Sequence, residues 1–252
     1  MKLLNEDPQI IFKTKEYPTM STGLPLLDQR LLGGFQRGSI IHFFGEPGAG
    51  KTTFAMQILC NILKQGWRAV WVDCNGAFSV NRFKKIIHKR STLIKSLIYV
   101  RPISFRHQTN IIQQLQYHVD KVGIIVVDPI THFYRAERFK EGTQGYFQEL
   151  ISKQLGTLTG IAHLRKIPII VINYGTINRQ KELVPLVIQG FKRVERYRFC
   201  FKNKNNDEKG EYKEITIERA PNTFAQGSIF GFHINSTGIA SLWLIKKRGT
   251  DQ

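Results

Sequence analysis

One short stretch, GEPGAGKT at positions 45–52, constrains the fold of this chain more than any other part of its sequence. It matches the pattern G-x-x-x-x-G-K-[ST] in full, directly after an apolar segment and directly before a helical pattern. Gly45, Gly48 and Gly50 let the backbone curl so that successive N–H groups converge on phosphate oxygens, and the helix N-terminus adds its positive dipole. The stretch therefore predicts a strand, a phosphate-binding loop and a helix, in that order.

Two side chains of this motif are expected to act directly on a nucleotide. Lys51 would reach the β- and γ-phosphates as a point charge, and the Thr52 hydroxyl would ligate Mg²⁺. A second magnesium ligand is usually an acid that ends a nearby apolar strand, and Asp128 ends the run VGIIVVD. We therefore expect ATP and Mg²⁺ as cofactors, with Thr52 and Asp128 holding the metal. The expected phosphate-binding positions are Gly45, Glu46, Pro47, Gly48, Ala49, Gly50, Lys51, Thr52 and Thr53.

Apolar, strand-like segments alternate with helical patterns from residue 38 onward. Strands are expected at 38–45, 68–73, 96–100, 122–128 and 167–173, and helices at about 51–63, 79–89, 107–119 and 144–165. This alternation predicts an α/β fold in which helices flank a mainly parallel sheet and ligands bind at the carboxyl ends of its strands. Residues 1–20 show no clear period, so we expect an N-terminal arm or capping strand there, followed by one core domain over 21–252.

After residue 190 the period of the pattern changes to two, which is typical of strands with one buried face. The segment 192–202 alternates aromatic with basic residues, and 211–219 and 227–234 follow as further strands. The polar, turn-rich stretch 203–210 is expected to link the first two. These features predict a C-terminal antiparallel meander over 191–240 that extends the sheet. The basic and aromatic alternation is compatible with nucleic-acid binding, but a strand with one buried and one exposed face explains it as well.

Thirty-seven Lys and Arg against 19 Asp and Glu give the chain a net charge of +18. Such a surface attracts polyanions, although a generally basic solvated surface would give the same count. The three cysteines show no metal-binding spacing, and no apolar run approaches the ~18 residues that a membrane span needs. We therefore expect an intracellular protein without a membrane partner, cytoplasmic and nucleoid-associated if prokaryotic, and nuclear if eukaryotic.

Five segments carry a resemblance to a known family. They are STGLPLLDQRLLGGFQRGSI (21–40), WVDCNGAFSVNRF (71–83), VVDPITHFYRAE (126–137), ELISKQLGTLTGIAHLRKIPIIVIN (149–173) and ITIERAPNTFAQGSIFGFHINSTGI (215–239). Together they resemble the RecA-type recombinase core, in particular that of archaeal RadA- and RadB-like proteins and their eukaryotic paralogues. The resemblance implies a RecA-like P-loop NTPase core without the N-terminal domain of the full recombinases. It also implies that Arg82 stacks on the adenine.

The chain departs from the family pattern at three positions, and the first two departures concern the hydrolytic step. The pattern D-T-E places its water-activating glutamate where this chain has Asn75, and an amide cannot accept a proton from the attacking water. General-base catalysis is typically worth ~10²–10⁴-fold, so we expect hydrolysis to be slow or absent. Tyr174 replaces the glutamine that resembles a γ-phosphate sensor, and Pro129 replaces the usual serine beside the magnesium acid. Lys51 and the degenerate position Asn75 are thus the candidate catalytic residues.

The resemblance also implies two DNA-contacting loops, at about 135–148 and 174–190. Their candidate contacts are Arg135, Arg138, Lys140, Arg179 and Lys181, which would bind phosphates of single-stranded DNA as cations. Glutamates dilute the positive charge of both loops. Residues 74–119 are more basic, with eight Lys or Arg and no Asp or Glu, but a helix end would favour several of these cations for structural reasons alone.

The leading hypothesis from the sequence is an ATP-binding accessory protein of homologous recombination and DNA repair with weak or absent hydrolysis. Its implied partners are DNA and other recombination proteins of the RecA family, in a homo- or hetero-oligomer. One alternative is an active DNA-dependent ATPase or recombinase, in which another carboxylate substitutes for Asn75. A third is a KaiC-like signalling or scaffold ATPase without a DNA role, although the Glu-Glu pair expected of that class at the end of the second core strand is absent.

Overall fold

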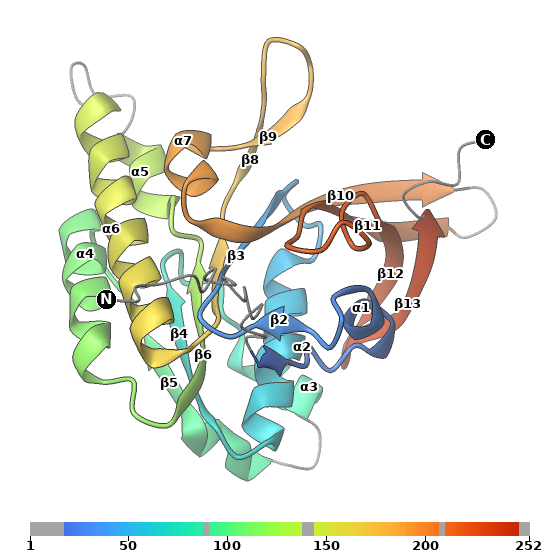
Figure 1. The fold of residues 1–252 in the computed structure, drawn as a ribbon, viewed down its shortest axis with the longest axis horizontal. Coiled ribbons are helices and arrows are strands. Elements are labelled where there is room, and N and C mark those ends of the chain that lie inside the picture. The colour runs from blue at the N-terminus through green and yellow to red at the C-terminus, as the bar shows by residue number, and fades with distance from the viewer. Residues whose placement is uncertain (1–17, 88–90, 138–143, 207–209, 247–252) are drawn as a thin grey trace, which may run out of the picture.

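The computed structural model describes residues 18–87, 91–137, 144–206 and 210–246, and a nine-stranded sheet forms the centre of this part of the chain (Figure 1). Its strands lie in the order β13 (Gly238–Lys246), β12 (Ile229–Asn235), β11 (Gly210–Arg219), β10 (Glu195–Asn206), β3 (Ile40–Gly45), β7 (Ile169–Ile172), β6 (Val122–Asp128), β4 (Arg68–Asp73) and β5 (Leu97–Val100). The strands from β10 to β5 are parallel, so their carboxyl ends meet at one edge. This confirms the predicted α/β fold with a mainly parallel sheet.

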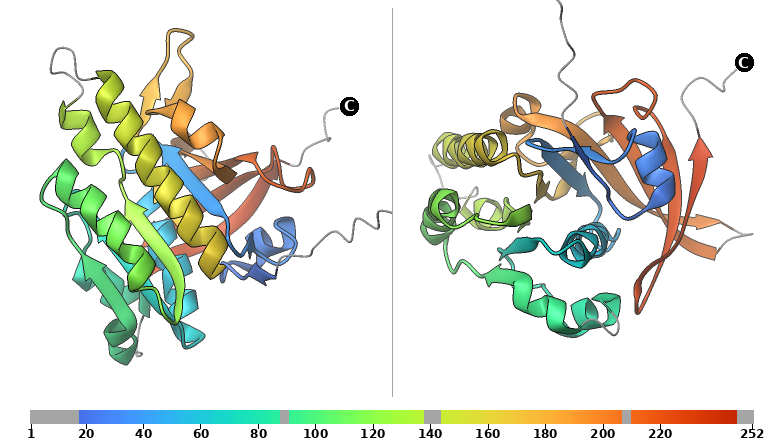
Figure 2. Two further views of the ribbon diagram at one scale, coloured as in Figure 1. Left: turned by 60° about the vertical axis from the view of Figure 1, so that its left-hand side comes forward. Right: turned by 60° about the horizontal axis from the view of Figure 1, so that its bottom comes forward.

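Helices cover both faces of the parallel part of the sheet (Figure 2). One face carries α2 (Lys51–Lys64) and α3 (Val80–Ile87), and the other carries α4 (Phe105–Gln114), α5 (His132–Glu137) and α6 (Gln144–Arg165). The central strands are therefore buried on both faces, which explains why β6 and β7 consist mostly of Val and Ile. The shorter helical elements are α1 (Pro25–Arg30), α7 (Ile188–Lys192), η1 (Ser91–Ser96) and η2 (Leu115–Tyr117).

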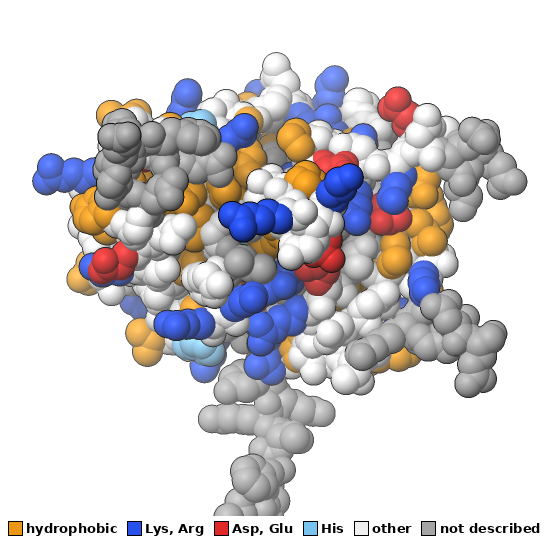
Figure 3. Space-filling view, turned by 90° about the horizontal axis from the view of Figure 1, so that it is seen from above, with side chains coloured by type: hydrophobic (Ala, Val, Ile, Leu, Met, Phe, Trp, Pro, Cys, Tyr) orange, Lys and Arg blue, Asp and Glu red, His pale blue; other side chains and the backbone are white. Residues whose placement is uncertain are grey.

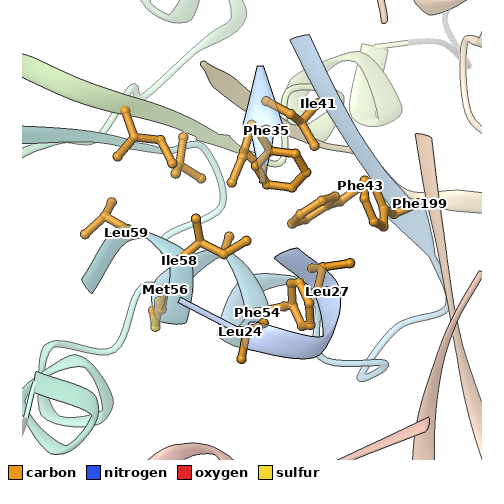
Figure 4. Close-up of a cluster of buried hydrophobic side chains, with 14 of the residues drawn as sticks. Leu24, Leu27, Phe35, Ile41, Phe43, Phe54, Met56, Ile58, Leu59 and Phe199 are labelled. Carbon is orange, nitrogen blue, oxygen red and sulfur yellow. The ribbon is translucent and has the colours of Figure 1, made fainter. Parts of the chain in front are cut away.

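Each face of the sheet has its own hydrophobic core because strand side chains alternate between the two faces. Figure 4 shows part of the core on the α2 side, where Phe43 of β3 and Phe199 of β10 lie close to Phe54 of α2. The ring centroids of Phe43 and Phe54 are 5.9 Å apart in an edge-to-face arrangement. This packing fixes α2, and with it the phosphate loop that precedes α2, against the centre of the sheet.

The C-terminal strands extend the sheet and curl around the side of α2 (Figure 2, right). β10 is parallel to β3 on one side and antiparallel to β11 on the other, and β11, β12 and β13 continue antiparallel. The antiparallel extension of the sheet is thus confirmed. Two details of the prediction were wrong: β10 continues to Asn206, through most of the stretch expected as a link, and a fourth strand, β13, reaches Lys246. Cross-strand pairing with β11 and β12 stabilises these polar and amphipathic residues as strands.

Both segments expected as long DNA-binding loops contain regular structure. α5 extends to Glu137 and α6 begins at Gln144, so only 138–143 lie between them, outside the described residues. The other segment contains a hairpin of β8 (Gly175–Ile177) and β9 (Leu183–Pro185), which projects from the body of the molecule in Figure 1. At the amino end, β1 (Thr19–Met20) pairs with β2 (Phe35–Gln36), while residues 1–17 of the expected arm are not described.

Candidate nucleotide-binding site

The phosphate loop connects the carboxyl end of β3 to the first turn of α2. Gly45, Gly48 and Gly50 have φ angles of 143°, 71° and 89°, all in the region that L-residues rarely adopt. A Cβ on Gly45 would lie 2.0 Å from the carbonyl oxygen of Phe201 in β10. Glycine at position 45 is therefore required both by the backbone angle and by the close approach of β10.

Lys51 lies over the loop that precedes it. Its Nζ donates to the carbonyl oxygens of Gly45 and Glu46, at 3.0 and 2.7 Å. Burial lowers the pKa of Lys51 to about 8, against the opposing attraction of Asp128. A bound polyphosphate would favour the charged form of the Lys51 ammonium. Lys51 therefore lies where it can bind phosphate, although the protein alone stabilises its charge only in part.

Thr52 and Asp128 meet at the base of the loop, where the Thr52 hydroxyl donates to Oδ2 of Asp128 at 2.7 Å. Burial raises the pKa of Asp128 to about 6, and repulsion from Asp73 adds to this, while the Thr52 hydrogen bond and Lys51 oppose it. A hydroxyl and a carboxylate oxygen are ligands that Mg²⁺ prefers, and a divalent cation would relieve the cost of the buried charge. No cluster of three or more His, Cys, Asp or Glu suited to a metal occurs in the described residues, so phosphate and water oxygens would complete the coordination.

Asp73 ends β4 directly beside Asp128, with which it is paired in the register of the parallel strands. Its carboxylate accepts hydrogen bonds from the turn that follows β4 and from β5. Oδ1 accepts from the Ala77 N–H at 3.1 Å, and Oδ2 accepts from the Phe78 N–H at 3.2 Å and from the Tyr99 hydroxyl at 2.8 Å. Asp73 is therefore a structural acid that holds the turn between β4 and α3.

Asn75 lies in that turn, exposed, with its side-chain oxygen accepting from the Ala77 N–H at 3.1 Å. Its amide also lies beside the hydroxyl of Tyr174 and lowers the pKa of the phenol, against the larger, opposite effect of burial. His132 Nδ1 lies 3.5 Å from the same hydroxyl, and the Arg135 guanidinium lies 5.1 Å from the centre of the Tyr174 ring. The two departures that the sequence singled out, at 75 and 174, are thus in direct contact.

A cavity of about 430 Å³ adjoins the phosphate loop. Its lining comprises Gly48, Gly50, Lys51, Thr52, Thr53, Arg82, Lys213 and Ile234. Arg82, from α3, donates to the Asn235 carbonyl oxygen at 3.1 Å, so its guanidinium spans from α3 to the end of β12. The structure thus brings the predicted phosphate and Arg82 positions to one cavity, whose ligand is still a prediction.

Sequence reasoning missed Lys213, which reaches this cavity from β11. Its Nζ donates to Asn203 Oδ1 at 2.7 Å, and the Asn203 N–H donates to Glu46 at 2.7 Å. The C-terminal strands therefore brace the phosphate loop and add a cation beside it. The alternating pattern of the sequence places Lys213 on a strand, but it does not say which element that strand faces. The contact of Lys213 with the cavity could therefore not be predicted from this pattern.

The candidate DNA contacts lie on separate elements. Arg135 is exposed on α5, whereas Arg179 and Lys181 are exposed at the tip of the β8–β9 hairpin. Three hydrogen bonds between Asn178 and Glu182 close this tip, one of them between their backbones. Arg138 and Lys140 fall outside the described ranges. Figure 3 views the molecule from above, where the hairpin lies, and shows Lys and Arg side chains spread across this face with fewer Asp and Glu among them.

None of the helices in the described part of the chain combines the length and the apolar composition that crossing a bilayer requires. All three cysteines are buried and unpaired.

Comparison with known proteins gives consistent relatives. The sequence matches the model of the Rad51 family over residues 13–185. It is 32% identical over 163 residues to the DNA repair and recombination protein RadB of Methanococcoides burtonii, covering 64% of this chain and 72% of the relative. The protein of the same name from Thermococcus kodakarensis is 35% identical over 175 residues, covering 68% and 76%. The crystal structure of the RadB recombinase covers 88% of this chain and 98% of its own, with a TM-score of 0.72 and 29% identity.

Proposed function

Because the chain belongs to the Rad51 family, we propose that it is an ATP-binding accessory protein of DNA recombination and repair that hydrolyses ATP slowly or not at all. Its relatives named RadB are DNA repair and recombination proteins, which supports the process. In this role ATP acts as a ligand that stabilises one conformation, since a nucleotide shifts an equilibrium between states that bind it with different affinity.

Nucleotide binding is supported by the complete phosphate loop. Its glycines adopt the required backbone angles, Lys51 lies over the loop, and Thr52 contacts the buried acid Asp128. Mg²⁺ bound by Thr52 and Asp128 would neutralise phosphate charge. Arg82 and Lys213 lie in the adjoining cavity, where they could bind the remainder of the nucleotide.

One observation supports slow hydrolysis. The amide of Asn75 lies beside Tyr174, at the carboxyl edge of the parallel sheet, where hydrolysis would need a general base. Asp73, the nearest alternative in the turn, accepts hydrogen bonds from two backbone N–H groups and one hydroxyl. An acid whose lone pairs are used in this way is poorly placed to accept a proton from water. We therefore favour weak hydrolysis over an active ATPase.

DNA binding is proposed through Arg135, Arg179 and Lys181, with single-stranded DNA as the substrate. A short path connects the nucleotide site to the hairpin that carries two of them. The Leu186 N–H donates to the Tyr174 carbonyl oxygen at 2.9 Å, and the Asn173 amide donates to the Leu186 carbonyl oxygen at 2.6 Å. A shift of Tyr174 on nucleotide binding would therefore move the hairpin. Association with other RecA-family proteins, or with a second copy, belongs to the same proposal.

The experiment is a calorimetric titration of ATP with Mg²⁺, followed by DNA titrations with an ATP analogue or ADP bound. Lys51→Ala should weaken ATP binding at least ~10-fold, because a charge-assisted phosphate contact is lost. Lys64→Ala, at the exposed far end of α2, is the matched control and should leave it unchanged. Equal ATP affinity in both variants would contradict the proposed site, and equal DNA affinity with both nucleotides would contradict nucleotide control.

A further inference from the structure

A second basic cavity, of about 420 Å³, lies at the opposite end of β3 from the phosphate loop. It is formed where Gly38 and Ser39 enter β3 and where the chain passes from α7 into β10. β3 has six residues at about 3.3 Å each, so the two cavities are roughly 20 Å apart. This cavity is therefore separate from the nucleotide site and from the β8–β9 hairpin, and the proposed function assigns it no role.

Three arginines line this cavity, which we call the arginine pocket: Arg193, Arg196 and Arg219. All three are exposed. Among the described residues, no carboxylate lies within ion-pair distance of Arg193 or Arg196. Arg196 is oriented by the neutral Gln36, whose side-chain oxygen accepts from its Nε. Two guanidinium groups are thus held at the surface with their charge available to an external anion.

The one acid in the pocket lining, Glu195, does not neutralise them. It is 3% exposed, and its Oε2 accepts from Nδ1 of the buried His42 at 2.6 Å. Its Oε1 accepts from Arg198, and Arg219 lies 3.8 Å away. Burial lowers the pKa of His42, which therefore remains neutral, and Arg198 already supplies the cation that pairs with Glu195. The carboxylate is thus satisfied from inside the protein, and the rim of the pocket stays positive.

We propose that the arginine pocket binds the sugar-phosphate backbone of DNA, as a contact region additional to the hairpin. A planar guanidinium matches the geometry of a phosphate and can bind two of its oxygens at once. Contacts of this kind position nucleic acid without reading its sequence. An acidic protein segment fits less well, because protein interfaces usually depend on large apolar anchors. The apolar residues of the lining are Ile40, Val194, Ala220 and Pro221, and none of them is aromatic.

This inference rests on the proposed DNA role, and the salt dependence of DNA affinity tests it. The unaltered protein, an Arg193→Ala/Arg196→Ala variant and an Arg68→Ala/Arg106→Ala control are titrated with fluorescent single-stranded and duplex DNA between about 50 and 200 mM salt. The control removes two exposed arginines from other elements, and so the same net charge. Unchanged thermal unfolding and ATP affinity would show that each variant is folded.

Each phosphate contact contributes ~0.7–0.9 to the slope of log affinity against log salt concentration. The pocket variant, which lacks two such contacts, should therefore lose about 1.5 in slope. It should also bind DNA roughly 10-fold more weakly near 100 mM salt. The control should lose far less. An Arg193→Lys/Arg196→Lys variant should keep most of the slope, because the charges remain.

Equal effects in the pocket variant and the control would overturn the inference. An Arg179→Ala/Lys181→Ala variant tells this failure apart from failure of the proposed function. If the hairpin variant loses DNA binding while the pocket variant behaves like the control, DNA binds at the hairpin alone. If the unaltered protein binds no DNA even at low salt, both the DNA role and the pocket assignment are wrong.

Discussion

Asp128 allows the electrostatics of the proposed magnesium site to be measured in the nucleotide-free protein. Its pKa rises from the ordinary 3.8 to about 6, chiefly because the carboxyl group is buried. An acid whose pKa is higher in the folded than in the unfolded state opposes folding once it ionises. The cost is absent below about pH 4, grows as the pH rises, and is complete above about pH 6. The rise corresponds to about 3 kcal/mol at neutral pH.

Asp128→Asn replaces this carboxylate with a neutral side chain of the same shape. We expect the variant to be more stable than the unaltered protein by about 2–3 kcal/mol at pH 7.5 and by only about 1 kcal/mol at pH 4.5, without nucleotide or Mg²⁺. Urea denaturation at both pH values measures the difference. Asp120→Asn, on a carboxylate whose side chain is 87% exposed, is the control and should change stability by less than about 0.5 kcal/mol at either pH.

The same substitution should weaken binding of ATP by at least ~10-fold in the presence of Mg²⁺ and much less without it, because a charged metal ligand is lost. A variant that is less stable at pH 7.5, or whose stability difference does not change with pH, would refute the argument that the site holds a strained carboxylate. Mg²⁺-independent loss of affinity would refute its assignment as a metal ligand.

Three further outcomes follow from other contacts. Asn75→Glu combined with Tyr174→Gln should raise ATP turnover by ~10²-fold or more, because the glutamate supplies a general base. The double variant should exceed either single variant, because the two side chains lie side by side. A change under ~3-fold in a steady-state assay would contradict this expectation. Gly45→Ala should cost about 2–4 kcal/mol in urea denaturation, since its Cβ would lie 2.0 Å from the Phe201 carbonyl oxygen, and unaltered stability would show that the loop can move away. Glu195→Ala should cost about 3–5 kcal/mol, because it leaves the buried imidazole of His42 without its carboxylate and removes the nearer of the two acids that pair with Arg198. The exposed Glu149→Ala is the control and should change stability far less in the same assay.

The parallel sheet and the phosphate loop could be predicted because their signals are local. The glycine pattern, the apolar runs and the acid at the end of VGIIVVD each lie within a few residues, and strands that point the same way bring their ends to one edge. That rule places Asp128 near Thr52, and the 2.7 Å contact between them is the geometry expected of a shared metal site.

The remaining contacts depend on how distant segments pack. His42 and Glu195 are 153 positions apart, and nothing in either neighbourhood predicts that they pair. Lys213 reaches the nucleotide cavity only because β10 and β11 curl around α2, which a period of two does not predict. The β8–β9 hairpin was expected as a loop because its strands have three residues each, too few for an alternating pattern to be visible.

A single-turnover experiment measures whether the bound ATP is hydrolysed. The protein is mixed in excess with labelled ATP and Mg²⁺, with and without single-stranded DNA. The fraction of bound ATP that is converted to ADP is then measured over time. Typical enzymes turn over at ~10 s⁻¹ and a missing general base costs ~10²–10⁴-fold, so we expect ATP to bind and to be hydrolysed more slowly than about 0.1 s⁻¹, with or without DNA. Faster conversion, or strong stimulation by DNA, would contradict a nucleotide site that binds ATP as a ligand and lacks its base.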